Sequence, residues 1–175
     1  RPPLSKAFLK NPEQAVQPLL SAAWYDGAGI TRHHDAAIAI DRDARQVRLA
    51  SGVDLPYGVL VLATGAHARR LPHLPEDLDN VAVLRSHADA LRLRERLDAA
   101  QTVGVIGGGF IGLEIAATAH ALGRRVAVFE SAPRLLARAV SGEVSEHVLQ
   151  THRDAGIEVR LGVPVGHFDV DTEGR

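Results

Sequence analysis

From residue 102 to the end of the chain, short apolar runs alternate with longer amphipathic segments. The runs have the length of β-strands, and the segments have the length of α-helices. In chain order they cover 102–106, 110–122, 126–129, 141–155 and 157–161, and 163–170 is a candidate for one more strand. Gly123 and Gly156 follow the two helical segments, where a residue with positive φ commonly ends a helix. This order predicts an α/β fold with a parallel sheet and right-handed crossovers.

The chain before residue 85 has a different pattern. Apolar and polar residues alternate at 37–40 and 46–49, which predicts two short strands. The continuous apolar run 59–63 favours a strand that is buried on both faces. Residues 14–25 are mostly helix formers, within an N-terminal region that several prolines interrupt.

A helix start is predicted at Ser86, because Asp89 follows three positions later in the manner of a capping box. Leu93 and Leu97 then give this helix an apolar face. We expect the arginines of the same helix to form a solvated face; they are Arg92, Arg94 and Arg96.

Three glycines form the pattern GxGxxG between a predicted strand and a predicted helix. Gly107 permits a tight turn, Gly109 lets a diphosphate approach the backbone, and Gly112 allows close packing of helix on strand. The first amides of the helix, at Phe110 and Ile111, would then face the phosphates. Incidental glycines in an ordinary turn are the alternative. The flanking strand and helix, with an acidic residue at the end of the next strand, instead predict a dinucleotide site.

That acidic residue is Glu130, which lies 18 positions after Gly112. A carboxylate there can accept hydrogen bonds from a ribose diol and would repel a 2′-phosphate. NADH is therefore predicted as the nucleotide, with NADPH the less favoured one. The cations Arg124, Arg125 and Arg134 are near enough in sequence to weaken this preference.

Composition narrows the classes of function. The 175 residues carry a net charge of −1, which argues against nucleic-acid binding through bulk charge. The absence of cysteine excludes a thiolate metal site or a redox-active dithiol within this sequence. The pair His33 and His34 would face opposite sides of a strand without an evident third ligand, so no metal site is predicted. Because no membrane-spanning run or signal peptide pattern is present, we expect no membrane association and a cytoplasmic protein.

Several longer strings are informative in combination. They are RPPLSKAFL, YGVLVLATGA, VLRSHADALRLRERL, VIGGGFIGLEIAATA and APRLLARAVSGEVSEH. Together and in this order, they resemble FAD-dependent ferredoxin reductases, the group that includes putidaredoxin and rubredoxin reductases. This group belongs to the pyridine nucleotide-disulphide oxidoreductase class. The resemblance extends over nearly the whole chain.

In such enzymes a Rossmann-type NAD domain is inserted in a second, Rossmann-like FAD domain. The resemblance implies that residues 1–84 are the middle portion of the FAD-binding domain. Residues 85–175 would be the NAD-binding domain, incomplete at its C-terminal end. Because the chain opens without methionine and ends in a turn-like string, we expect an internal fragment of a longer polypeptide.

The resemblance also implies a catalytic pair. Lys6 would lie beside the flavin, and Glu114 would reach it from the helix after the glycine-rich loop. A lysine beside reduced flavin can stabilise developing negative charge, and a carboxylate can hold the lysine in place. By residue type alone, Lys6 would be a surface lysine and Glu114 a first-turn glutamate that favours the helix dipole.

Further cofactor contacts are implied by the same resemblance. Thr64 and Gly65 would form a loop near the flavin, although a plain strand end explains them equally well. Arg85 would contact the diphosphate or adenosine side of FAD, and otherwise it is a surface arginine before a helix. Ala37 stands where relatives often have a larger valine whose backbone contacts the adenine.

The function implied is that of an NADH-dependent flavoprotein reductase. NADH would deliver a hydride to FAD, and electrons would pass singly to a [2Fe–2S] ferredoxin that serves an oxygenase or a cytochrome P450. One alternative is a related NADH oxidase, peroxidase or disulfide reductase, against which Lys6 and the lack of cysteine argue. Another alternative is a dinucleotide-binding module without turnover. The sequence leaves homodimer formation open.

Overall fold

The computed structural model of the protein describes residues 4–11, 18–72, 74 and 78–166. The chain divides into two units. The larger unit comprises Arg1–Val16 with His67–Arg175, and the smaller unit is Gln17–Ala66.

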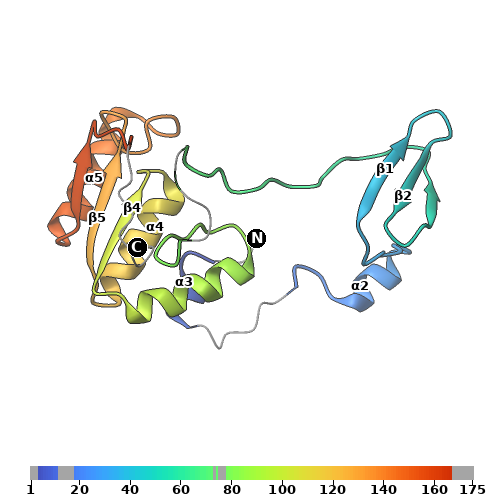
Figure 1. The fold of residues 1–175 in the computed structure, drawn as a ribbon, viewed down its shortest axis with the longest axis horizontal. Helices are drawn as coiled ribbons and strands as arrows, with labels where there is room; N and C mark the ends of the chain where they lie inside the picture. The colour runs from blue at the N-terminus through green and yellow to red at the C-terminus, as the bar shows by residue number, and fades with distance from the viewer. Residues whose placement is uncertain (1–3, 12–17, 73, 75–77, 167–175) are drawn as a thin grey trace. The chain divides into compact units, whose positions relative to one another are not determined.

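The larger unit is built on a parallel sheet of three strands (Figure 1). Its order is β4 (Thr102–Ile106), β5 (Arg125–Glu130) and β6 (Glu158–Leu161). The helix α4 (Phe110–Ala121) connects β4 to β5, and α5 (Gly142–Asp154) connects β5 to β6. The predicted α/β architecture with a parallel sheet is therefore confirmed.

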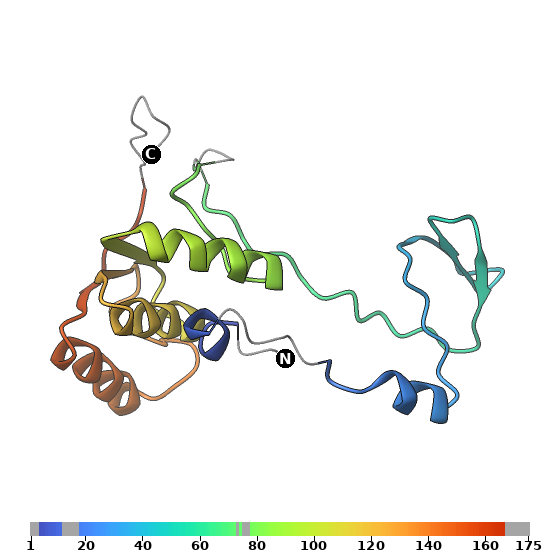
Figure 2. The same cartoon turned by 90° about the horizontal axis from the view of Figure 1, so that it is seen from below.

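Helices α3 (His87–Ala99) and α1 (Ala7–Lys10) complete the larger unit. Figure 2 shows α1, in dark blue, beside α4. Phe8 and Leu9 of α1 are buried in one hydrophobic cluster with residues of the sheet and the other helices. The remaining buried members are Ala90, Leu93, Leu97, Val105, Leu113, Ala116, Ala119, Val126, Val128, Leu135, Leu136, Leu149, Ile157 and Val159. The short helix α1 is therefore held against the parallel sheet and its helices by apolar burial.

The helix ends follow the signals that the sequence carries. Ser86 caps α3, and its reciprocal hydrogen bonds with Asp89 form the predicted capping box. The glycines predicted to end α4 and α5 have positive φ, +81° at Gly123 and +91° at Gly156. These local signals account for the start of α3 and the ends of α4 and α5.

The arginines of α3 correct one expectation. Arg94 donates to the Leu9 carbonyl oxygen, and Arg96 donates to the Val81 carbonyl oxygen. Both side chains are half-buried, and only Arg92 is exposed. A long arginine can bury its aliphatic stem while its guanidinium reaches an acceptor. Two of the three therefore tie α3 to neighbouring segments and do not form a solvated face.

We expect Asp89→Asn to lower the free energy of unfolding by about 1 kcal/mol near neutral pH, because it weakens the capping box. The Ser86 amide and hydroxyl and the Arg85 amide outweigh burial and lower the pKa of Asp89 to about 2. A depressed carboxyl pKa stabilises the fold above the unfolded value of about 4, and this stabilisation is lost as pH falls toward the folded value. Urea unfolding of variant and wild type at a series of pH values measures the difference.

The difference in stability between the two proteins should shrink as pH falls from about 5 to about 2. Asp154→Asn is the matched control, because Asp154 is exposed at the end of α5. A difference for Asp89→Asn that stays constant over the whole range would contradict the assignment of the low pKa to the capping box.

The smaller unit contains one short helix and an antiparallel sheet. The elements are α2 (Ala22–Gly27), β1 (Ala37–Asp41), β2 (Gln46–Leu49) and β3 (Asp54–Pro56), with the strands in the order β1-β2-β3 (Figure 1). The two strands predicted here are confirmed as β1 and β2. β3 was not predicted because three residues are too few to show an alternating pattern.

The buried strand predicted at 59–63 is wrong for this structure. These residues form no strand, and Val59, Val61 and Leu62 are 86%, 80% and 68% exposed. A buried strand needs hydrogen-bonded neighbours on both edges, and none of the described strands pairs with this run. Within the described part of the chain, no neighbouring strand therefore buries the apolar side chains of this run.

Two other predictions fall partly on residues that the structure does not describe, namely 14–17 and 167–170. In the described remainder of 14–25, the helix begins only at Ala22, after the N-cap Ser21. Residues 163–166 form neither strand nor helix.

Candidate functional site

The loop between β4 and α4 turns at Gly107, whose φ is +104°. Glycine adopts this conformation without the steric cost that a Cβ imposes. The Gly107 amide donates to the Phe129 carbonyl oxygen at 2.8 Å, so the chain leaves β4 while still bonded to β5. This geometry agrees with the tight turn expected at Gly107.

Gly112 and Gly109 have opposite surroundings. A Cβ at Gly112 would overlap the carbonyl oxygen of Gly107 and lie 3.3 Å from Val105 Cγ1, so this glycine lets α4 pack on β4. A Cβ at Gly109 would meet no atom of the described chain within 4 Å. The absent side chain at Gly109 therefore opens space outside the protein, as a ligand-facing glycine requires.

The amides of Gly109, Phe110 and Ile111 open α4. No side chain caps this helix, and we find no acceptor for these three amides among the described residues. Phe110 and Ile111 are exposed. The first amides of a helix carry the positive end of its dipole, so this end can bind an anion such as a diphosphate.

Glu130 ends β5, and its carboxylate bonds to the glycine-rich loop. Oε2 accepts the Gly108 amide at 2.6 Å, while Oε1 accepts the Ala132 amide at 2.7 Å and the Ser131 hydroxyl at 3.3 Å. Burial disfavours the charged form, but these donors outweigh it and lower the pKa of Glu130. A carboxylate has about four acceptor positions, so one remains for a ribose hydroxyl.

Sequence reasoning missed Gly108, which anchors Glu130. A Cβ at Gly108 would overlap the Leu135 side chain and lie 3.2 Å from Glu130 Cβ. The Leu136 amide also donates to the Gly108 carbonyl oxygen at 3.0 Å. The only signal in the sequence was the run of three glycines, whose middle member stands at a position that the GxGxxG pattern leaves free.

Of the three arginines expected near Glu130, Arg124 and Arg125 lie at the other end of β5. Arg134 donates to carbonyl oxygens of the segment 137–141, so its guanidinium is engaged within that segment. The length of β5 therefore keeps Arg124 and Arg125 away from Glu130, which their proximity in the sequence did not show.

Lys6 and Glu114, far apart in sequence, form an ion pair with Nζ 3.0 Å from Oε1. Glu114 projects from α4, and Lys6 immediately precedes α1. The side chains are 63% and 30% exposed, so Lys6 remains accessible to another molecule. The Ser5 hydroxyl donates to the second carboxylate oxygen of Glu114. The structure thus brings together the two residues predicted to act as a pair.

The other predicted contacts are distributed over both units. Arg85 precedes the N-cap of α3 in the larger unit, and its amide donates to Asp89 at 3.1 Å. Ala37, Thr64 and Gly65 are exposed residues of the smaller unit. Gly65 has a φ of +79°, a backbone conformation that favours glycine.

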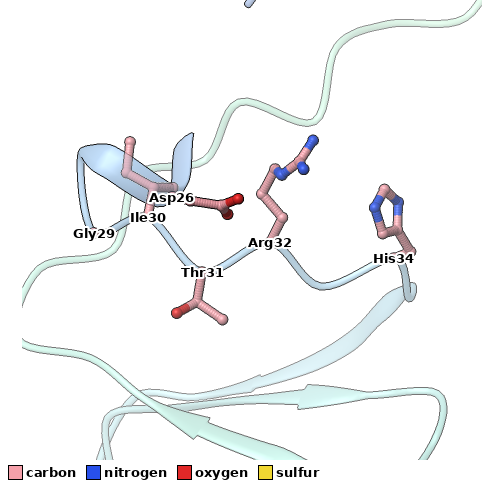
Figure 3. Close-up of a pocket in the computed structure, with 6 residues that line it drawn as sticks. All are labelled: Asp26, Gly29, Ile30, Thr31, Arg32 and His34. Atoms are coloured by element: carbon pink, nitrogen blue, oxygen red, sulfur yellow. The ribbon is translucent and has the colours of Figure 1, made fainter. Parts of the chain in front are cut away.

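The smaller unit has a surface hollow of about 480 Å³, and Figure 3 shows the residues that line it. Its lining residues are Asp26, Gly29, Ile30, Thr31, Arg32 and His34. All six are exposed, and Arg32 lies over the Tyr25 ring at 4.5 Å from the ring centroid. None of the residues predicted for a cofactor contributes to this hollow.

The described residues contain neither a metal-binding cluster nor a membrane-spanning helix. No group of three or more His, Cys, Asp or Glu side chains there is arranged to hold a metal ion. Within the same part of the chain, every helix is too short or too polar to cross a membrane.

The chain matches a known protein family over nearly its whole length. Residues 1–174 match the family described as pyridine nucleotide-disulphide oxidoreductase. The chain belongs to this family. The resemblance stated from the sequence motifs is therefore confirmed, and the glycine-rich loop of this pyridine nucleotide-disulphide oxidoreductase has the expected place between strand and helix.

Two curated relatives are similar to this family member. The chain is 42% identical over 164 residues to the ferredoxin–NAD(+) reductase component of the anthranilate 1,2-dioxygenase system of Burkholderia cepacia. It is 41% identical over 164 residues to the rubredoxin–NAD(+) reductase of Pseudomonas putida. Each alignment covers 92% of this chain but only 40% and 42% of the relatives, respectively. The chain therefore spans about two fifths of their length.

Solved structures of reductases are also similar to this oxidoreductase. The covalent complex of putidaredoxin reductase with putidaredoxin matches with a TM-score of 0.88 and 38% identity, over 99% of this chain and 43% of that chain. The ferredoxin reductase of a cytochrome P450 system from Rhodopseudomonas palustris matches with a TM-score of 0.87 and 38% identity, over 100% of this chain and 46% of that chain.

Proposed function

We propose that this chain is part of an NADH-dependent flavoprotein reductase that passes electrons from NADH through FAD to a [2Fe–2S] ferredoxin. The observation that carries the proposal is the loop at 107–112. Its helix amides have no acceptor among the described residues, and the space at Gly109 is open. Similarity to ferredoxin and rubredoxin reductases supports the same class of acceptor.

The proposal includes a domain assignment. Residues 85–175 are most of an NAD-binding domain, inserted in an FAD-binding domain whose middle portion is residues 1–84, and a longer polypeptide supplies the rest. The exposed apolar run 59–63 supports this assignment, because partner strands of a complete FAD domain would bury it. The parallel arrangement of β4, β5 and β6 supports the NAD-binding part.

The nucleotide is NADH in this proposal. The diphosphate binds at the amides of Gly109, Phe110 and Ile111, where it takes the place of a helix cap. Glu130 accepts a hydrogen bond from the adenosine ribose, and its lowered pKa keeps it charged at neutral pH. Its negative charge disfavours the 2′-phosphate of NADPH.

Lys6 and Glu114 serve the flavin in this proposal. FAD, when bound, accepts the hydride of NADH and releases electrons one at a time. The 63% exposure of the Lys6 side chain leaves its ammonium free to approach a ring that gains negative charge, so the pair fits this cofactor. Glu114 holds the lysine at 3.0 Å. Thr64, Gly65, Arg85 and Ala37 are further proposed contacts of FAD.

The absorption spectrum of the purified full-length protein tests the proposal. We expect flavin bands that NADH bleaches under anaerobic conditions, and electron transfer to ferricyanide and to an added [2Fe–2S] ferredoxin. Bound flavin that NADH leaves oxidised would favour a nucleotide-binding module without turnover. Reduction of disulfides, peroxide or oxygen in preference to ferredoxin would favour the related flavoenzymes. The cytoplasmic location stays a prediction of the sequence, which leaves homodimer formation open.

A further inference from the structure

Two residues outside the ion pair hold the Lys6–Glu114 pair in place. Thr118 lies one helical turn after Glu114, so both side chains project from the same face of α4. The Thr118 hydroxyl donates to the carbonyl oxygen of Ser5 at 2.9 Å. The Ser5 hydroxyl, in turn, donates to Oε2 of Glu114. Ser5 is thus bonded to α4 through both its backbone and its side chain.

Thr118 is a polar residue at a buried position of α4. It is 3% exposed, and its neighbour on the helix, Ala119, belongs to the hydrophobic cluster. A buried hydroxyl is costly unless it is hydrogen-bonded, and a valine would fill nearly the same volume without that cost. The hydroxyl is therefore explained by its bond to Ser5, which fixes the backbone one residue before Lys6.

The two oxygens of Glu114 have different partners. Oε1 faces Lys6 at 3.0 Å, and Oε2 accepts the Ser5 hydroxyl. An exposed ion pair alone constrains long side chains weakly. A second hydrogen bond to the carboxylate restricts its rotation and so directs the lone pairs of Oε1 at the lysine.

We propose that Ser5 and Thr118 are positioning residues for the Lys6–Glu114 pair: Thr118 sets the backbone of Ser5, and Ser5 orients the carboxylate that holds Lys6. The proposal rests on the proposed function for its catalytic meaning, since the pair acts on the flavin. It assigns neither residue a contact with the cofactor.

The first test measures the pair directly and needs no flavin. The chain has only two lysines, Lys6 and Lys10, and the exposed Lys10 is an internal reference. Trace acetylation with acetic anhydride, followed by peptide mass spectrometry, gives the reactivity of Lys6 relative to Lys10. We expect Ser5→Ala and Thr118→Val to raise this ratio by about twofold or more, because the ion pair weakens. Thr118→Ser keeps the hydroxyl and should restore the wild-type ratio.

The second test is stopped-flow reduction of the FAD-loaded full-length protein by NADH. Ser5→Ala should slow the reduction step about tenfold, the effect expected for a lost hydrogen bond to a charged group, while the NADH concentration for half-maximal rate stays unchanged. Thr118→Ser should react like wild type. Because Ser5 acts through Glu114, Ser5→Ala should have no further effect in a Glu114→Ala background. Thr151→Val, which removes an exposed threonine hydroxyl from α5, is the matched control.

The outcomes separate the two proposals. Unchanged Lys6 reactivity in Ser5→Ala, or an equal effect of Ser5→Ala with and without Glu114, overturns the positioning role. If NADH fails to reduce the flavin of the wild-type protein, the proposed function fails. Lys6 reactivity then still decides whether Ser5 and Thr118 hold the pair.

Discussion

Gly109→Val is expected to weaken NADH binding by about 100-fold, a loss of about 2.7 kcal/mol, while the protein stays folded. A Cβ at Gly109 meets no atom of the described chain within 4 Å, so a branched side chain costs the fold little. The same side chain would occupy the space through which a diphosphate approaches the amides of Phe110 and Ile111. Isothermal titration calorimetry of the full-length protein with NADH measures the affinity.

Two other glycines make the test specific. Gly142→Val is the matched control, because Gly142 opens α5 and also has open space around its missing Cβ. It should bind NADH like wild type. Gly112→Ala should unfold the larger unit instead, since its Cβ would overlap the Gly107 backbone. Undiminished NADH affinity in Gly109→Val would refute the placement of the diphosphate at this loop.

The parallel sheet and its helices could be predicted because their signals are local and agree. Ser86 begins a helix, and Gly123 and Gly156 end two more, as caps and positive φ require. Thr102–Ile106 was predicted as a strand with the same bounds. The conformation of Gly107 follows from the same logic, since a strand that turns at once into a helix needs an unusual φ there.

Features that depend on distant partners could not be predicted in this way. The run 59–63 has the composition of a buried strand, but composition does not say whether neighbouring strands are present. Arg94 looked like a solvated residue because its acceptor, the Leu9 carbonyl oxygen, lies far away in sequence. Gly108 was missed for a similar reason, since its contact with Leu135 arises only when the segment after β5 folds back.

The Lys6–Glu114 pair depends on residues far apart in sequence, yet it could still be predicted. Nothing in the local sequence relates the two residues, and residue type alone favours a surface lysine. Resemblance to a family predicted the pair, and the burial of Phe8 and Leu9 explains how it forms. These two apolar residues fix α1 against the core, and the lysine before them is carried to α4. Ser5 and Thr118 escaped notice because hydroxyls in such positions carry no pattern.

Glu130→Arg is expected to raise the ratio of kcat/KM for NADPH to kcat/KM for NADH by roughly 100-fold. In the proposed site, the substitution would remove the acceptor of the ribose hydroxyl, and a hydrogen bond to a charged group is worth about 1.5–3 kcal/mol. It also replaces a charge that repels the 2′-phosphate with one that attracts it. Arg125 is at the opposite end of β5 from Glu130, and the Arg134 guanidinium donates to carbonyl oxygens of the segment 137–141.

Glu130→Gln separates the charge of this residue from its anchoring role. Glutamine retains one oxygen acceptor, but its amide nitrogen only donates, so the side chain cannot accept from both the Gly108 and Ala132 amides. It should lower kcat/KM for NADH about tenfold and leave NADPH nearly as poor a substrate as before, because no cation is introduced. If Glu130→Arg left the ratio unchanged while both variants lost activity equally, the carboxylate would serve only to hold the loop through Gly108. The preference for NADH would then have to come from groups other than this carboxylate.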